Sequence, residues 1–130
     1  MFEDSKAYSS FAVPDPEGAR AFYAGTLGLT TELLFGGELL DLTLPGGDAH
    51  VLIYRKPDHV PAVFTVLNFP VDDLEGTVDG LLAAGVQMAR FEGFDQDERG
   101  IARGNGQGPD IAWFRDPAGN IIAVHTADGM

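Results

Sequence analysis

The feature that most constrains the fold of this chain is an internal repeat. The stretch "VPDPEGARAFYAGTLGL", residues 13–29, aligns with "VDDLEGTVDGLLAAGV", residues 71–86. The alignment matches a Val, an Asp, a Glu and a Gly at a constant spacing, and one deletion then brings Gly28 onto Gly85. A sequence that repeats itself in this way indicates two copies of one supersecondary unit.

Each copy of the repeat predicts a strand, then a helix, then a sharp stop. Apolar runs precede the two copies, and Asp15 and Asp73 are suited to cap the exposed N–H groups of the helices that follow. Gly28 and Gly85 suit the left-handed conformation that commonly ends a helix. Helical spacing gives each helix one apolar face, formed by Ala19, Phe22, Tyr23 and Leu27 in the first copy and by Leu74, Val78, Leu81 and Leu82 in the second.

Extended runs separated by Gly and Pro turn signals complete each copy. The predicted strands cover residues 8–13, 29–35, 38–44 and 49–54 in the first copy, and 64–71, 86–91, 110–114 and 121–125 in the second. We therefore expect an α+β fold in which two βαβββ modules form a cupped, barrel-like eight-stranded mixed sheet with one helix per module. The expected organisation is a single domain over residues 1–130, with module one at about 7–55, a linker at about 55–62 and module two at about 63–126.

Charge and composition narrow the possible partners. The formal net charge is -12, from 8 Lys and Arg against 20 Asp and Glu, and such a field repels nucleic acid and anionic membranes but tolerates a cationic small molecule. The absence of cysteine excludes disulfides and thiolate zinc sites. No apolar run approaches the roughly 20 residues of a membrane span. We expect a cytoplasmic protein with neither nucleic acid nor a membrane as partner.

Two motifs carry a family resemblance. The stretches "FYAGTLGL", residues 22–29, and "FRDPAGN", residues 114–120, the latter followed by an apolar strand, resemble the vicinal oxygen chelate superfamily. That superfamily includes glyoxalase I, extradiol dioxygenases, fosfomycin-modifying enzymes and bleomycin-resistance proteins. The resemblance covers essentially the whole chain, from residue 7 to residue 126. It implies the paired-module fold and a homodimer.

The resemblance also implies where a metal would be held. Enzymatic members take divalent-metal ligands, mostly His and Glu, from the first and last strands of each module. The corresponding positions here are Tyr8, Val51 or Leu52, Val66 and Ala123. Valine, leucine and alanine cannot ligate a metal, and a lone tyrosine rarely does so. No metal or other cofactor is therefore expected, the alternative being a divalent metal bound through other residues, such as His50 with Glu38 or Asp41.

Strand alternation predicts which side chains line the cup. The expected ligand-binding residues are Tyr8, Ser10, Phe64, Asn68, Trp113 and His125, with Arg103 as a further contact from the glycine-rich segment 92–109. Aromatic walls with a few polar groups suit a planar or amphipathic small molecule. The alternatives are that Trp113 is a plain core residue and that His125 only makes a structural hydrogen bond. His59 falls in the linker, where we expect it to be solvated.

The segment 92–109 has two interpretations. As a lid it would bring Arg99 or Arg103 to a ligand carboxylate, or use Asp95, Asp97 and Glu98 to hold a cation. The alternative is a solvated surface loop.

These patterns favour a metal-free small-molecule-binding protein of the glyoxalase/bleomycin-resistance type. The ligand would be a planar or amphipathic molecule, including a cationic one, held in an aromatic cup. The alternative is a glyoxalase- or dioxygenase-like enzyme, a lyase, isomerase or oxygenase. That enzyme would be metal-dependent through another ligand set, or metal-independent with Tyr8 and His125 as acid and base. A third hypothesis is an interaction module whose cup is filled by side chains.

Overall fold

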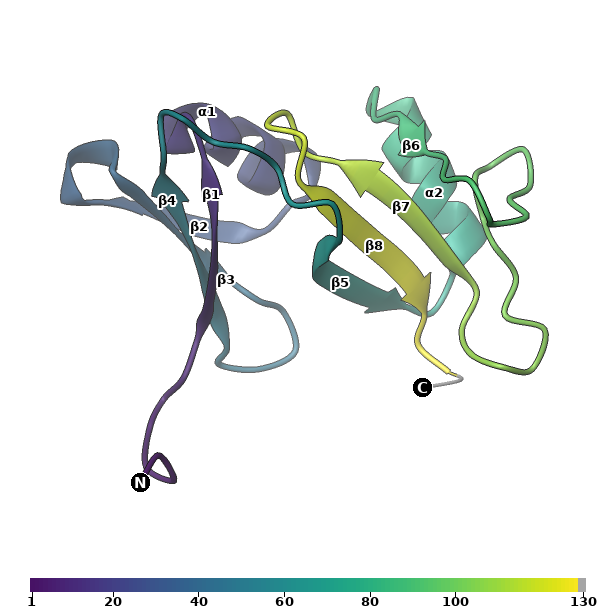
Figure 1. Cartoon of the computed structure of the whole chain (residues 1–130), viewed down its shortest axis with the longest axis horizontal. Coiled ribbons are helices and arrows are strands. Elements are labelled where there is room, and N and C mark those ends of the chain that lie inside the picture. Colours follow the sequence, from purple (N-terminus) through teal and green to yellow (C-terminus); the bar gives the residue numbers. More distant parts are fainter. Residues whose placement is uncertain (129–130) are drawn as a thin grey trace. The chain divides into compact units, whose positions relative to one another are not determined.

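A computed structural model describes residues 1–128 of the chain (Figure 1). Internal contacts divide the chain into two compact units, which we call unit one (residues 1–60) and unit two (Pro61 onward). Each unit has one four-stranded mixed sheet, and the strands pair only within their own unit.

Unit one follows the order strand, helix, three strands. Its elements are β1 (Ser9–Val13), α1 (Pro16–Arg20), the π-helical segment η1 (Ala21–Thr26), β2 (Thr30–Leu34), the 3-10 turn η2 (Phe35–Gly37), β3 (Leu39–Thr43) and β4 (His50–Arg55). The strand order across the sheet is β1-β4-β3-β2. Strand β1 runs parallel to β4, and the other pairs are antiparallel.

Unit two repeats this topology, which confirms the two predicted βαβββ modules. Its elements are β5 (Thr65–Val71), α2 (Leu74–Ala83), β6 (Met88–Ala89), β7 (Ile111–Arg115) and β8 (Ile121–Thr126). The strand order is β5-β8-β7-β6, with β5 parallel to β8. Strand β6 is shorter than the sequence predicts, because the chain leaves the edge of β7 after Ala89.

The two helices begin differently although both start after an aspartate. The Asp73 carboxylate accepts a hydrogen bond from the Gly76 N–H at 3.0 Å, as predicted for a cap. Asp15 makes no such capping bond, which corrects the prediction for the first helix. A Cβ on Gly76 would lie 2.2 Å from an Asp73 carboxylate oxygen, so a larger residue here would displace the carboxylate from its capping position.

Each sheet has one face buried under its helix. In unit one this face carries Phe11, Leu40, Leu42, Val51 and Ile53, and in unit two it carries Leu67, Ala112, Phe114, Ile122 and Val124. Helix α2 contacts β8, and Figure 1 shows it against one face of the sheet of unit two. Leu82, predicted on the apolar face of this helix, is 45% exposed instead. We call the opposite side of each sheet its open face.

Among residues 1–128, no helix is long and apolar enough to cross a membrane.

Candidate functional site

Strand register defines matching rows of side chains on the two open faces. In unit one the row is Ser10, Leu52, Asp41 and Glu32, and in unit two it is Asn68, Ala123, Trp113 and Ala89. Directly paired residues project to the same side of a sheet. Each row therefore begins with one polar side chain and continues with an apolar one.

The rows settle which residue of β4 matches the metal-ligand position. Val51 is 3% exposed and belongs to the helix face, whereas Leu52 is paired with Ser10 and Asp41 on the open face. The open face thus carries Leu52 in unit one and Ala123 in unit two at these positions. Within residues 1–128 no group of three or more His, Cys, Asp or Glu side chains is arranged to hold a metal ion.

Trp113 lies in an apolar cluster on the open face of unit two. The cluster contains Ala89, Ala102, Trp113, Ile121 and Ala123, with Phe91 and Ile111 packed against it. The rings of Phe91 and Phe94 lie 5.5 Å and 4.9 Å from the Trp113 ring, and Trp113 is only 8% exposed. Segment 90–104 therefore covers this part of the open face, and Phe94, 53% exposed, is its outer aromatic surface.

His125 shares that face and is also buried. Its register partner is Ile111, and the residue is 5% exposed. The ring Nδ1 lies 2.8 Å from the Thr126 carbonyl oxygen, and because a carbonyl only accepts, Nδ1 carries the hydrogen. This bond corresponds to the structural interpretation of His125.

The other predicted lining residues are accessible. Tyr8 is 64% and Phe64 66% exposed, and Ser10 and Asn68 are exposed as well. A register shift between Thr65 and Leu67 interrupts the regular pairing just after Phe64. Simple alternation from Asn68 back to Phe64 therefore does not hold across this irregularity. Tyr8 and Ser10 belong to unit one, and Phe64 and Asn68 to unit two.

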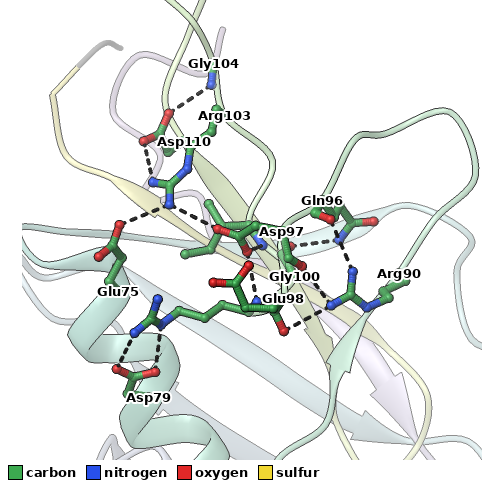
Figure 2. A network of polar contacts seen from close by, with 12 residues as sticks. Glu75, Asp79, Arg90, Gln96, Asp97, Glu98, Gly100, Arg103, Gly104 and Asp110 are labelled. Atoms are coloured by element: carbon green, nitrogen blue, oxygen red, sulfur yellow. Dashed lines mark hydrogen bonds and ion pairs between the residues drawn. The ribbon is translucent and has the colours of Figure 1, made fainter.

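Both arginines of segment 92–109 bond to carboxylates of unit two itself (Figure 2). The Arg103 guanidinium donates to Asp110 at 3.1 Å and to Glu75 and Asp97 at 3.0 Å each. The Arg99 guanidinium donates to both carboxylate oxygens of Asp79 on α2, at 2.9 and 3.2 Å. Both arginines predicted to reach a ligand are thus engaged with the protein's own carboxylates.

The pKa values of this network follow from the same contacts. The Gly104 N–H and then the Arg103 guanidinium hold the pKa of Asp110 below its ordinary value. Burial raises the pKa of Asp97, but the N–H groups of Ile101 and Arg99 together with Arg103 outweigh it, and the net pKa is lowered. The lowered pKa values favour the ionised forms of Asp97 and Asp110, and both carboxylates share the single positive charge of Arg103.

The amide of Gln96 and the guanidinium of Arg90 tie the first part of segment 90–104 to the sheet edge. The Gln96 side chain accepts from the Phe91 N–H and donates to the carbonyls of Ala89 and Gly100. Arg90 donates to the Asp97 carbonyl at 2.8 Å and to the Glu98 carbonyl at 3.1 Å (Figure 2). The sequence shows these residues only as polar members of a loop, and no local pattern indicates their partners.

On the open face of unit one a histidine and a carboxylate form a pair. The His50 Nδ1 lies 2.7 Å from the Asp41 Oδ1, and the two side chains are 44% and 21% exposed. Glu38, the other acid considered with His50, pairs with Arg55 instead. His59, expected in solvent, is half-buried, with a shielded Nε2 that has no hydrogen-bond partner.

The turn "DPAGN" has a structural role in this fold. The Asp116 Oδ1 accepts from the N–H groups of Ala118 and Asn120, and the Asn120 amide donates to the Asp116 Oδ2 at 3.0 Å. Gly119 adopts a φ of 92°, which favours glycine. Both polar side chains are almost fully buried, so the motif fixes the start of β8.

Comparisons with known proteins show the family. The model of the Glyoxalase/Bleomycin resistance protein/Dioxygenase superfamily matches residues 7–124, so the chain belongs to this superfamily. No curated protein matches the sequence significantly.

Solved structures share the fold at low sequence identity. The antibiotic binding protein TnmS3 from Streptomyces sp. CB03234 is 23% identical, with a TM-score of 0.65 over 95% of this chain and 97% of that one. A lactoylglutathione lyase from Agrobacterium tumefaciens is 21% identical, with a TM-score of 0.61 over 95% and 96%. A glyoxalase/dioxygenase from Nostoc punctiforme is 16% identical, with a TM-score of 0.67 over 96% and 92%. These likenesses include both binding proteins and enzymes, so the fold alone does not assign a reaction.

Proposed function

We propose that this protein binds a planar or amphipathic small molecule on the open faces of its sheets without a metal, as a cytoplasmic homodimer. The observation that carries the proposal is the matching pair of rows. At the positions where enzymatic relatives hold a metal, the rows carry Leu52 beside Ser10 and Ala123 beside Asn68. An apolar side chain next to a hydroxyl or an amide suits a flat ligand with one polar group.

Exposed aromatic rings and the acidic surface support the same function. Tyr8, Phe64 and Phe94 are each more than half exposed, and each offers aromatic surface on which a flat ligand can stack. The net charge of -12 favours a cationic ligand over an anionic one. A likeness to the antibiotic binding protein TnmS3 is consistent with this class of ligand. The alternative, an enzyme with Tyr8 and His125 as acid and base, has less support because the His125 ring is buried and bonded to Thr126.

The test uses Trp113 as an internal reporter, since it is the chain's single tryptophan. The probes are 2-naphthylmethylammonium and 2-naphthalenesulfonate, which share a flat ring system and differ in charge. We expect the cation to raise the thermal midpoint and change the tryptophan emission, and the anion to bind more weakly. No response to either probe would contradict the proposed function.

Variants of two exposed phenylalanines localise the binding. Phe94→Ala removes an exposed ring 4.9 Å from Trp113, and we expect it to weaken binding of the cation about tenfold, at the upper end of an aromatic contact. Phe2→Ala is the matched control, because Phe2 is 77% exposed near the N-terminus, outside both sheets. Equal weakening in the two variants would show that the response does not come from the open face of unit two.

A further inference from the structure

We infer that the His50–Asp41 pair is a proton-accepting subsite on the open face of unit one, and that it takes the hydroxyl of a phenolic ligand. The inference rests on the proposed function, since it names a ligand class for one of the same open faces. The pair differs from the four positions at which the family resemblance would place metal ligands, and the inference gives it a role that needs no metal.

The geometry fixes which ring nitrogen faces the ligand. An ionised carboxylate can only accept hydrogen bonds, so the 2.7 Å contact to Asp41 requires the hydrogen to be on Nδ1 of His50. In the neutral ring Nε2 then carries a lone pair. The His50 side chain is 44% exposed, and we expect this lone pair to accept from a hydrogen-bond donor outside the protein.

The surroundings of the pair select the kind of donor. Thr43 is the register partner of His50, and Glu32 is the register partner of Asp41 on the same face. Tyr8 directly precedes β1, and His50 is the first residue of β4, which runs parallel to β1. The carboxylates of Asp41 and Glu32 disfavour a ligand that arrives as an anion, so the donor that binds here is neutral.

An apolar floor adjoins the pair. Along β4 the open face continues from His50 to Leu52 and then to Tyr54, which is paired with Leu39. Leu52 and Leu39 are half-buried, and Tyr54 is exposed. A flat ring resting on this floor would bring a ring substituent to the His50 Nε2. The open face of unit one therefore differs from that of unit two, where segment 90–104 covers the corresponding face.

A phenol matches both features. Its O–H donates to Nε2, and transfer of that proton breaks the O–H bond, forms an N–H bond on His50 and leaves a phenolate beside an imidazolium. Asp41 stabilises the imidazolium through the Nδ1–H bond, as carboxylates do in acid–base pairs. A methyl ether of the same ring has no proton to give, so it leaves Nε2 without a partner.

The test compares 4-nitrophenol with 4-nitroanisole on the full chain. The nitrophenolate absorbs at longer wavelength than the phenol, so the spectrum of the bound probe reports the proton transfer. At a pH below the pKa of the free probe, we expect bound 4-nitrophenol to show phenolate absorbance. We expect His50→Gln to weaken its binding about tenfold and to abolish that absorbance, with little effect on 4-nitroanisole.

Matched variants separate the subsite from general effects. His59→Gln and Asp48→Asn change a histidine and an acid of unit one outside the pair, and we expect both to behave as the wild type. Asp41 is a positioning residue, and in Asp41→Ala, which removes the acceptor of the Nδ1–H, we expect ¹⁵N spectra to lose the single Nδ1–H tautomer of His50 at nearly unchanged thermal stability. A wild-type tautomer in this variant would overturn the assignment of Asp41.

The outcomes distinguish this inference from the proposed function. If the naphthyl cation binds but 4-nitrophenol and 4-nitroanisole bind equally well, or His50→Gln has no effect, the phenol subsite is wrong and small-molecule binding stands. If none of the four probes binds, both fail.

Discussion

At the scale of single residues, the buried turn at the start of β8 depends on one carboxylate. In Asp116→Asn, an amide nitrogen replaces one of the acceptor oxygens that serve the Asn120 amide and two backbone N–H groups. Because these groups are buried, we expect a loss of about 1–3 kcal/mol in the free energy of unfolding, measured by urea denaturation. Asp95→Asn, at an exposed position, is the control, and an equal midpoint for the two variants would contradict a structural role for the turn.

Trp113 gives a second prediction at this scale. The side chain is 8% exposed and packs in the apolar cluster under Phe91 and Phe94. Trp113→Ala would leave a cavity, and we expect it to destabilise the protein by about 3–5 kcal/mol in thermal or urea unfolding. Phe94→Ala, at a position that is 53% exposed, should cost much less. A Trp113→Ala protein as stable as the wild type would mean that the segment 90–104 does not cover this ring in solution.

How far the sequence predicts these residues depends on the range of the interactions. Alternation correctly grouped Trp113 with Ala123 on one face, because side-chain direction in a strand is a local property. The burial of Trp113 was not predictable in the same way, since it depends on Phe91 and Phe94 folding back from another segment. Partners brought together by tertiary contacts leave no periodic pattern in the sequence.

At the scale of elements, arginines hold segment 92–109 to α2 and to Asp110, the residue before β7. The sequence shows its glycines and charges but not that Arg103 reaches Glu75 in α2, far back in the chain. The form of the lid interpretation in which an arginine reaches a ligand required a free guanidinium, whereas Arg103 makes three bonds within the protein. The order of helices and strands was predicted well because its signals are local, although the Asp15 cap and the length of β6 were wrong. The position of the segment is set instead by these long-range ion pairs.

Removing this arginine should loosen the segment. In Arg103→Gln the carboxylates of Glu75, Asp97 and Asp110 lose their shared cation, so we expect faster hydrogen exchange in residues 95–104. The Arg103 side chain is 41% exposed, so solvent screening limits the loss of stability to about 1 kcal/mol. Arg55→Gln, which removes a single exposed pair with Glu38, is the control. Unchanged exchange in Arg103→Gln would show that the segment is held by its apolar contacts alone.

The same network predicts a pH dependence. The pKa values of Asp97 and Asp110 are lowered in the folded protein, so their stabilisation is complete above the ordinary carboxyl pKa of about 4 and is lost as the pH falls through the lowered values. We expect the stability difference between wild type and Arg103→Gln to shrink below about pH 4 in urea titrations. A difference that grows in acid would contradict the sign of both shifts.

At the scale of the whole molecule, the side chains available decide whether the protein can bind a divalent metal ion. The four positions at which the family resemblance would place metal ligands carry Tyr8, Leu52, Val66 and Ala123. Residues 1–128 contain no group of three or more His, Cys, Asp or Glu side chains that could hold a metal ion. His50 and Asp41 offer two donors, but the Nδ1 of His50 is turned to Asp41, so a metal at Nε2 would find no second ligand from that carboxylate. Metal sites need three or more ligands to hold a divalent ion tightly.

We therefore expect less than stoichiometric nickel, manganese, iron or zinc after loading and dialysis, measured by elemental analysis. One tightly held ion per chain would contradict the metal-free proposal, and its loss in His50→Gln but not in His59→Gln would show that the open face of unit one is a metal site instead.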